Sequence, residues 1–542
     1  MAEETPKKRS QILTGICLGL SLLAAVGIAF SRGTAAETDY AVVNVVTALL
    51  GLLAWTTLVI GLQRSSLPRG IWRCVLLLPI LLVAGFFTMN KVKRFNGELV
   101  PQFESRWGGS DVQWEAREKE AIPVDLLEPA ERGFSQFRGS ERDGVVDGVQ
   151  LQSDWESEPP TINYKRPIGS GWSGFAVQGG VAITLEQRDQ EEWVTAYNVG
   201  TGDLLWHYSM EGVHQHVMGG IGPRSTPTIW EDKVYVVSAV DKLVCLELAT
   251  GSEIWSVNLL DGAQADFEEL VTWGRSGSAV VDQGRVIVPV GGVSDDRATL
   301  IALDANTGDE LLRFGDYQIS YSSPVIAVLD GIKQLIYTSE ENLSGFSLED
   351  GEMLWTVPAP GSSAGQANVA QPIVVNSNQV LITKGYGLGG RLWRVARATD
   401  GAWKTEKIWE KSSVLKTKFT SAVIRGDHAY ALSDGILECV EIATGKRIWK
   451  RGRYRQGQVL LVGEHLVVTS EGGEVVLVQA TPEQFNELGR KRVIGDVTWN
   501  TAAMVGDILL MRNSDEMASV RLPAILSDSG ATDETQIQRE TL

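Results

Sequence analysis

Residues Glu441-Ile-Ala-Thr-Gly-Lys-Arg-Ile-Trp449 form a phrase that returns along the chain and decides its fold. Close copies of the phrase end at Trp206, Trp255 and Trp355, weaker copies end at Leu312 and Trp409, and degenerate ones lie near Tyr164 and Leu488. From Trp206 to Trp449, successive copies are 40 to 57 residues apart. Repeats of this length indicate supersecondary units that stack on one another.

Each repeat contains several short strands. Apolar or alternating runs such as 233–238, 243–248 and 285–290 are separated by Gly, Asp, Asn and Ser residues, as in strands joined by tight turns. The Thr-Gly or Asp-Gly step of the phrase supplies a residue that tolerates positive φ at the hairpin before the last strand. The Trp that follows is expected to pack between neighbouring units. Four-stranded blades closed into a ring satisfy this pattern, because closure removes exposed sheet edges.

The starts of the presumed innermost strands give the number of blades. Eight segments align, at spacings of 37 to 52 residues, and begin at Trp172, Arg224, Arg275, Tyr321, Val369, Phe419, Gln456 and Trp499. The sequence therefore predicts an all-β, eight-bladed β-propeller over residues 134–525. The segment 134–164 is expected to complete the last blade beside residues 499–523, and a seven-bladed ring stays open as an alternative.

Residues 1–94 are predicted to be a membrane anchor. The runs 11–30, 41–62 and 71–89 are each about twenty residues long and nearly free of charge, which is enough for three transmembrane helices. A signal peptide is the alternative for the first run, but it lacks a small-residue cleavage site. The basic cluster at 7–9 favours a cytoplasmic N-terminus, so three spans would place the propeller in the periplasm, anchored to the inner membrane.

Two segments outside the repeats are predicted to be loosely ordered, namely a polar linker at 95–133 and an acidic tail at 526–542. The first 94 residues carry ten Lys or Arg and four Asp or Glu. Since the whole chain has a net charge of −18, the remainder carries −24. Such a surface repels phosphate backbones, and nucleic acid is therefore not expected as a partner.

The repeats resemble a known family. The phrase A-T-G-x-x-I-W, the opening F-S-Q-F-R-G-S-E-R-D-G at Phe134 and the segment G-W-S-G-F-A-V at Gly171 are similar to bacterial pyrroloquinoline-quinone (PQQ)-like repeat propellers. The resemblance covers roughly residues 134–523. It implies one of two branches, the PQQ-dependent alcohol, methanol and glucose-type dehydrogenases or the non-enzymatic propeller of the outer-membrane barrel assembly machine. Because both share the blade motif, the motif indicates fold rather than function.

The candidate site is one mouth of the central channel, where the inner strands begin. The residues that the alignment brings together there, as a possible cofactor-binding set, are Trp172, Arg224, Arg275, Tyr321, Lys418 and Trp499. Arg offers paired donors to carboxylates and Trp offers a flat face, so the set suits a planar, anionic ligand such as PQQ. In the alternative interpretation each Arg pairs with a local acid and each Trp fills the tapering channel.

The dehydrogenase branch implies further chemistry, namely a Ca²⁺ or lanthanide ion and an Asp base. The acids Asp266, Glu268 and Glu269 are not distinguished by any spacing, and no catalytic or metal-binding residue is predicted. The sequence has neither the adjacent Cys pair of many alcohol-oxidising members nor a C-x-x-C-H haem site. His214 and His216 form an H-x-H pair, but no third metal ligand stands at a recognisable spacing.

The sequence thus favours a membrane-anchored, periplasmic binding or scaffolding module of the cell envelope. Its expected partners are the membrane itself and a protein or small anionic ligand at the channel mouth. The alternative is a membrane-bound PQQ-dependent dehydrogenase that oxidises an alcohol or sugar with calcium. A sensory propeller that signals through its helices is a third reading, although the sequence contains no output module.

Overall fold

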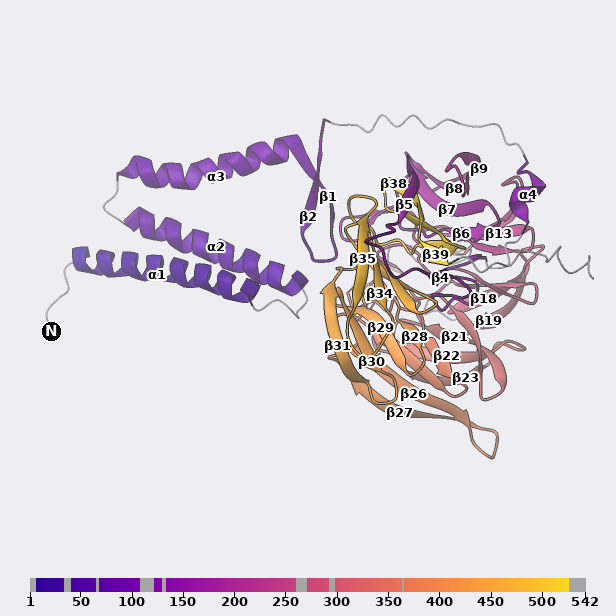
Figure 1. Ribbon diagram of the computed structural model, residues 1–542. Helices are drawn as coiled ribbons and strands as arrows, with labels where there is room; N and C mark the ends of the chain where they lie inside the picture. The colour runs from indigo at the N-terminus through magenta and orange to yellow at the C-terminus, as the bar shows by residue number, and fades with distance from the viewer. Residues whose placement is uncertain are drawn as a thin grey trace, which may run out of the picture.

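A computed structural model describes residues 6–33, 40–64, 68–107, 121–128, 133–259, 271–291, 298–362 and 365–525. Within these ranges the chain forms a helical segment and a propeller of eight antiparallel sheets (Figure 1). The first four sheets are β6–β9 (Ala176–Gln178, Val181–Arg188, Glu191–Asn198, Leu204–Glu211), β12–β15 (Thr228–Trp230, Lys233–Val237, Lys242–Glu247, Glu253–Asn258), β16–β19 (Val280–Asp282, Arg285–Pro289, Leu300–Asp304, Glu310–Phe314) and β20–β23 (Val325–Leu329, Ile332–Thr338, Asn342–Ser347, Met353–Pro358).

The other four sheets complete the ring and confirm the predicted count of eight blades. They are β24–β27 (Ile373–Asn376, Gln379–Lys384, Gly389–Arg397, Trp403–Lys411), β28–β31 (Val423–Arg425, His428–Ser433, Ile436–Glu441, Lys446–Arg453), β32–β35 (Gln458–Val462, His465–Thr469, Glu474–Gln479, Glu487–Arg492) and β36–β38 (Ala503–Val505, Ile508–Arg512, Glu516–Arg521) with β5 (Thr161–Pro167). The seven-bladed alternative is therefore wrong.

The ring is closed by strands from opposite ends of the propeller. Strand β5 pairs antiparallel with β38, with Thr161 opposite Arg521, so the early segment completes the last blade as predicted. The inner strand β36 then contacts β6, the inner strand of the first complete blade. Two short strands, β3 (Val145–Val146) and β4 (Gln150–Leu151), add to this closure by pairing with β32 and with β39 (Ala524–Ile525).

Four Trp residues of the repeated phrase donate to the next blade, as the sequence predicts, whereas Trp355 donates to Gln334 of its own blade. Trp206 is 1% exposed, and its Nε1 donates to the Leu248 carbonyl of the following blade at 3.0 Å. A Cβ on Gly251, in the Thr-Gly turn of that blade, would lie 2.4 Å from the Trp206 ring. Trp255, Trp409 and Trp449 donate to backbone carbonyls in the same way. Glycine is thus required both by its φ of +67° and by the ring beside it.

The N-terminal segment forms three helices, α1 (Pro6–Gly33), α2 (Tyr40–Arg64) and α3 (Arg69–Met89), which extend from one side of the propeller (Figure 1). Ser21 of α1 contacts Thr57 of α2, with their hydroxyl oxygens 2.6 Å apart. Among the described helices, α2 is long and apolar enough to cross a membrane, with a mean hydropathy of 2.2. The apolar parts of the other two helices, Thr14–Ala29 and Leu76–Met89, are shorter.

The structure departs from the predicted linker at 95–133. Strand β1 (Asn90–Phe95) begins directly after α3 and pairs antiparallel with β2 (Pro101–Ser105), and the resulting hairpin lies against the propeller. Ile122 is buried and donates its backbone N–H to the Ala249 carbonyl, just before the short helix α4 (Val124–Leu127). Strand pairing and backbone hydrogen bonds thus hold parts of a segment whose polar composition suggested a linker. The predicted tail at 526–542 lies outside the described residues.

Candidate functional site at the channel mouth

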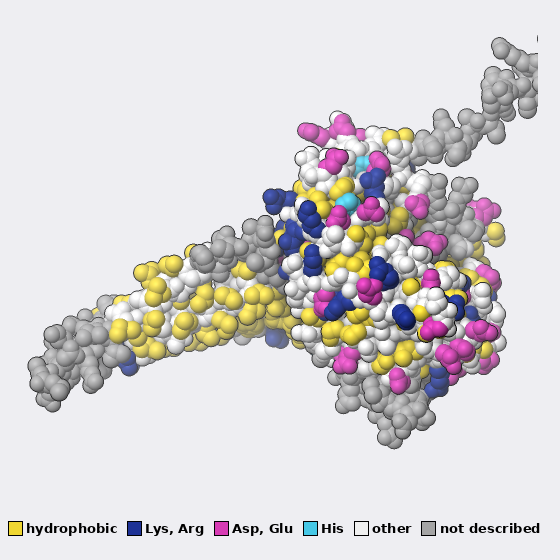
Figure 2. All heavy atoms as spheres, turned by 90° about the horizontal axis from the view of Figure 1, so that it is seen from below, with side chains coloured by type: hydrophobic (Ala, Val, Ile, Leu, Met, Phe, Trp, Pro, Cys, Tyr) yellow, Lys and Arg dark blue, Asp and Glu magenta, His cyan; other side chains and the backbone are white. Residues whose placement is uncertain are grey.

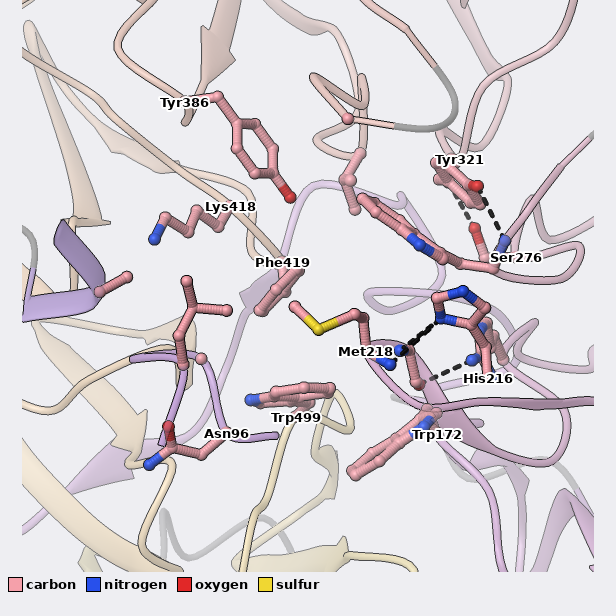
Figure 3. Close-up of a pocket in the computed structure, with 18 of the residues that line it drawn as sticks. Asn96, Trp172, His216, Met218, Ser276, Tyr321, Tyr386, Lys418, Phe419 and Trp499 are labelled. Atoms are coloured by element: carbon pink, nitrogen blue, oxygen red, sulfur yellow. Dashed lines mark hydrogen bonds between the residues drawn. The ribbon is translucent and has the colours of Figure 1, made fainter. Parts of the chain in front are cut away.

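A cavity of about 1040 Å³ lies at the mouth of the channel, on the side from which the helices extend. Its walls come from the starts of inner strands and the loops before them, from the hairpin tip (Asn96–Val100) and from the first turns of α2. Figure 3 shows its aromatic and polar side chains converging from several blades. The N-terminal helical segment and its hairpin are therefore part of the cavity wall.

Five of the six residues predicted for the mouth line this cavity, namely Trp172, Arg224, Tyr321, Lys418 and Trp499. Arg275 does not line it. Its side chain is 2% exposed and donates to the carbonyls of Pro289 and Val290 at 3.2 and 3.0 Å. The prediction of Arg275 as a ligand-binding residue is not supported by its position. Its guanidinium also donates to the Val240 carbonyl of the preceding blade and pairs there with Asp241 at 3.5 Å, as in the alternative interpretation of an Arg with a local acid.

Aromatic rings make up the most distinctive part of the wall. The ring centroids of Trp172 and Trp499 are 4.7 Å apart, and those of Phe419 and Trp499 are 4.8 Å apart. On the opposite wall Trp273 stacks on Tyr321 at 5.4 Å with an interplanar angle of 21°. Rings at these separations attract one another and bury a large apolar area. The alignment predicted Trp172, Tyr321 and Trp499 for this place, whereas Trp273 lies in a loop that it did not include.

Arg224 is directed toward the protein rather than toward a ligand. Its Nη1 donates to the Gly222 carbonyl and its Nη2 to the Gly219 carbonyl, both at 2.6 Å. Burial lowers the pKa of Arg224 to about 10, and nearby Tyr321 and Glu192 oppose that shift. The guanidinium thus holds the glycine-rich loop before its strand, which carries β10 (Gln215–His216) and β11 (Gly220–Ile221).

The tip of the hairpin caps one side of the mouth. The backbone N–H of Gly97 donates to Oε1 of Glu471 at 2.6 Å, and Nε1 of Trp499 donates to the same oxygen at 2.8 Å. Glu471 is 2% exposed, and burial raises the pKa of its carboxyl. A Cβ on Gly97 would lie 2.3 Å from Cγ of Gln456, so only glycine fits there. One buried carboxylate therefore joins the hairpin to the aromatic wall.

Charged groups fasten the base of the same hairpin. Arg94 is 3% exposed, pairs with Asp496 and places its guanidinium 5.3 Å from the Trp172 ring centroid. Lys93 pairs with Asp515 at 2.9 Å. Since Arg94 is buried in this contact, the hairpin and the propeller mouth form one packed unit.

Helix α2 is tied to the same unit. Nδ2 of Asn44 donates to the Glu98 carbonyl at 2.8 Å. The guanidinium of Arg453, on the outer strand β31, lies 3.9 Å from the Tyr40 ring centroid, a cation–π contact. The start of α2 is thus held against both the hairpin and the propeller.

The pair His214 and His216 does not belong to a metal site in the described part of the chain. His216 lines the cavity, and its Nδ1 accepts from the backbone N–H groups of Met218 and Gly219, both at 3.2 Å. His214 is buried, and burial together with the charge of Arg224 lowers its pKa to about 3. No group of three or more His, Cys, Asp or Glu side chains that could hold a metal occurs among the described residues, and the considered acids at 266, 268 and 269 lie outside them.

The two arginines of the predicted cofactor-binding set are bonded to the backbone of the protein itself. PQQ carries carboxylates on a fused ring, and the two arginines predicted to bind them, Arg224 and Arg275, both donate to backbone carbonyls. Lys416, another cation of the wall, pairs with Asp434. The described residues therefore offer stacking surfaces for a ring, whereas the predicted arginines are directed to backbone carbonyls; Lys418, the third predicted cation, lines the cavity.

Comparison with known proteins gives relatives of two kinds. Residues 190–451 match the family model described as "Outer membrane protein assembly factor BamB". The chain is 27% identical to the alcohol dehydrogenase (quinone) dehydrogenase subunit of Gluconobacter oxydans (strain 621H) over 318 residues, and 23% identical to BamB of Moranella endobia (strain PCIT) over 270 residues. These matches cover 52% and 47% of this chain but 37% and 64% of the two relatives.

A solved structure gives the same fold. The quinohemoprotein alcohol dehydrogenase from Comamonas testosteroni aligns over 73% of this chain and 81% of its own, with a TM-score of 0.52 and 12% sequence identity. At this identity the likeness concerns the fold alone.

Proposed function

We propose that this chain, whose β-propeller resembles PQQ-like repeat propellers and matches both BamB and quinoprotein alcohol dehydrogenases, is a binding or scaffolding module of the cell envelope. One observation carries the proposal: the mouth cavity is walled by aromatic rings and by the chain's own hairpin, while its arginine is directed to backbone carbonyls. Such a wall suits the recognition of a ligand. It is less suited to binding a carboxylated cofactor, which a PQQ-dependent dehydrogenase needs for turnover.

The proposed anchor is the helical segment 1–94, with three spans, a cytoplasmic N-terminus and a periplasmic propeller at the inner membrane. Support comes from the spanning length of α2 and from the apolar stretches of α1 and α3, all on one side of the propeller. The positive charges at 7–9 favour the same orientation.

Cysteine accessibility in intact cells tests this topology. Single cysteines replace Glu3 and the exposed Glu349 in a chain whose four native cysteines are serine. A membrane-impermeant maleimide should label position 349 before lysis and position 3 only after lysis. Labelling of position 3 in intact cells, or protection of position 349, would contradict the proposed orientation.

A PQQ-dependent dehydrogenase is the second candidate, favoured by the names of several relatives. Full-length protein in detergent is mixed with PQQ, Ca²⁺, a dye acceptor and a panel of alcohols and sugars. For a binding module we expect neither dye reduction nor a rise in Tm, since a bound cofactor stabilises the folded state by mass action. PQQ-dependent dye reduction would establish the dehydrogenase and refute the binding module.

A further inference from the structure

The mouth cavity shares a wall with the membrane helix. Ala41, Val42, Val45 and Val46, in the first two turns of α2, line the cavity. Val42, Val45 and Val46 are also 62%, 45% and 37% exposed, so the apolar surface continues from the cavity onto the outside of the helix. Figure 2 shows hydrophobic side chains covering the helices up to the propeller.

The length of α2 places these turns at a membrane interface. Its 25 residues span about 38 Å, whereas the hydrocarbon core of a bilayer is about 30 Å thick. If the opposite end of α2 lies in the other interface, the turn at Ala41–Val46 lies at the boundary between headgroups and acyl chains. The cavity then opens where lipid chains end and headgroups begin.

The part of the cavity wall beside the hairpin has the composition of a membrane-interface surface. Trp172, Phe419 and Trp499 form a continuous cluster of rings, and Met218 points between them in Figure 3. Trp and Tyr are the residues that membrane proteins place at the interface, where one side of the ring is apolar and the other is polar. A flexible Met side chain adapts to a ligand of variable shape.

From this juxtaposition we infer that the cavity takes up an acyl chain of a membrane phospholipid, which enters along α2 from the outer leaflet. The inference rests on the proposed anchoring and goes beyond it by naming the ligand class. The volume of the cavity, about 1040 Å³, lies just above the roughly 300–1,000 Å³ of small-molecule sites, which suits a long acyl chain. The apolar wall needs no ionic partner from the ligand, which agrees with the internal bonds of Arg224.

Photolabelling by lipid tests the inference on the full chain. The protein is reconstituted in phosphatidylcholine nanodiscs that contain a trace of phosphatidylcholine with a diazirine at the end of one acyl chain. After irradiation and digestion, mass spectrometry maps the adducts. We expect adducts on propeller peptides that contain Trp172, Phe419 or Trp499, in addition to those on the helices.

Two single-substitution variants distinguish labelling by lipid in the cavity from labelling by lipid at the outer surface. Val369→Trp narrows the cavity from its wall and should lower the adducts on the propeller at least fivefold, with adducts on α1 and α3 unchanged. Val328→Trp adds the same ring near the end of β20, at a position that is 53% exposed and does not line the cavity, and it should leave both sets unchanged. Thr501→Phe, also in the cavity wall, replaces Val369→Trp should that variant lose the Tm of the wild type.

The outcomes distinguish the inference from the anchoring. Adducts on the helices alone, or equal labelling of the propeller in the Val369→Trp and Val328→Trp variants, overturn the acyl-chain site and leave the anchor standing. Absence of adducts from helices and propeller alike overturns the anchor and, with it, the inference.

Discussion

The buried side chain of Glu192 joins two neighbouring blades. It lies on β8, is 0% exposed, and accepts from the Ala239 backbone N–H of the next blade at 3.2 and 3.1 Å. Burial raises the pKa of Glu192 to about 8, although the Ala239 N–H and the charge of Arg224 oppose the shift. At neutral pH the folded protein therefore holds a proton on a group that would be ionised in the unfolded chain.

The substitution Glu192→Gln should change how stability depends on pH. Between the unfolded pKa of about 4.3 and the folded pKa of about 8, the folded state binds the extra proton, so wild-type stability falls as pH rises through this window. Gln does not titrate, and the variant should gain stability relative to the wild type from pH 5 to pH 8, on the order of 1–4 kcal/mol. Tm values at both pH values check this.

The exposed residue Glu349 supplies the control. Glu349→Gln should give the same Tm difference from the wild type at pH 5 and pH 8. If Glu192→Gln behaves like this control, Glu192 is ionised in the folded protein across the range, and its proposed protonation is wrong.

Sequence reasoning predicted which residues meet at the mouth better than it predicted the direction of their side chains. The alignment of strand starts correctly brought Trp172 and Trp499 together, because equivalent positions of a ring point to one mouth. It could not separate Arg224, on the cavity wall, from Arg275, because the direction of a long side chain depends on nearby carbonyls. It also missed Glu471, which follows β33 rather than starting an inner strand.

At the scale of elements, the contact between a Trp and the glycine turn of the next blade joins neighbouring blades. Gly251→Ala should cost the backbone strain of positive φ and also the displacement of the Trp206 ring, which a Cβ would approach to 2.4 Å. Gly284→Ala has a φ of +75° and nothing within 4 Å of the added Cβ, so it carries the strain alone. We expect Gly251→Ala to be less stable than Gly284→Ala by about 1–3 kcal/mol in chemical denaturation. Equal losses would show that the ring contact is dispensable.

The hairpin after α3 offers a second test at this scale. Gly97→Ala should expel the tip from the mouth, because the added Cβ would meet Gln456 and Glu471. Limited trypsin cleavage after the buried Arg94 should then become several-fold faster, while the Tm of the propeller stays within a few degrees of the wild type. Gly472→Ala, where the added Cβ meets only a Ser470 oxygen at 3.8 Å, is the neighbouring control. Equal cleavage rates in the two variants would contradict docking through Gly97.

Elements of the repeat were predictable and the hairpin was not predicted, although a signal for it exists. The strands and turns of the blades recur, and each copy supports the others. The step Asn96-Gly97 is typical of hairpins, but the surrounding polar composition suggested a linker, and the residue with positive φ in this turn is Leu99. The ion pairs of Lys93 and Arg94 with Asp496 and Asp515 that fix the hairpin join residues about four hundred positions apart, and no local pattern reveals them.

For the whole molecule, closure of the ring depends on the C-terminal strands. A chain that ends after Thr498 lacks β36, β37 and β38, so β5 loses its partner and the blades on either side lose a neighbour. Because each blade is stabilised by both neighbours, we expect this chain to lose its cooperative thermal transition and to be degraded rapidly by protease. A chain that ends after Ile525 keeps all eight sheets and should retain the wild-type Tm. A cooperative transition in the shorter chain would contradict the role of closure.

Closure of the ring also imposes a delay during synthesis, between the making of β5 and the making of its partner β38. The hydrogen bond from Asn163 on β5 to Ser519 on β38 joins residues that are 356 positions apart. At about 5–20 residues per second, the chain needs roughly 20 to 70 s to reach the second partner after it has made the first. Throughout this interval the helices are already available to the membrane, while the edge of β5 has no strand beside it. The nascent protein is therefore most exposed to strand-mediated aggregation while it is still being made.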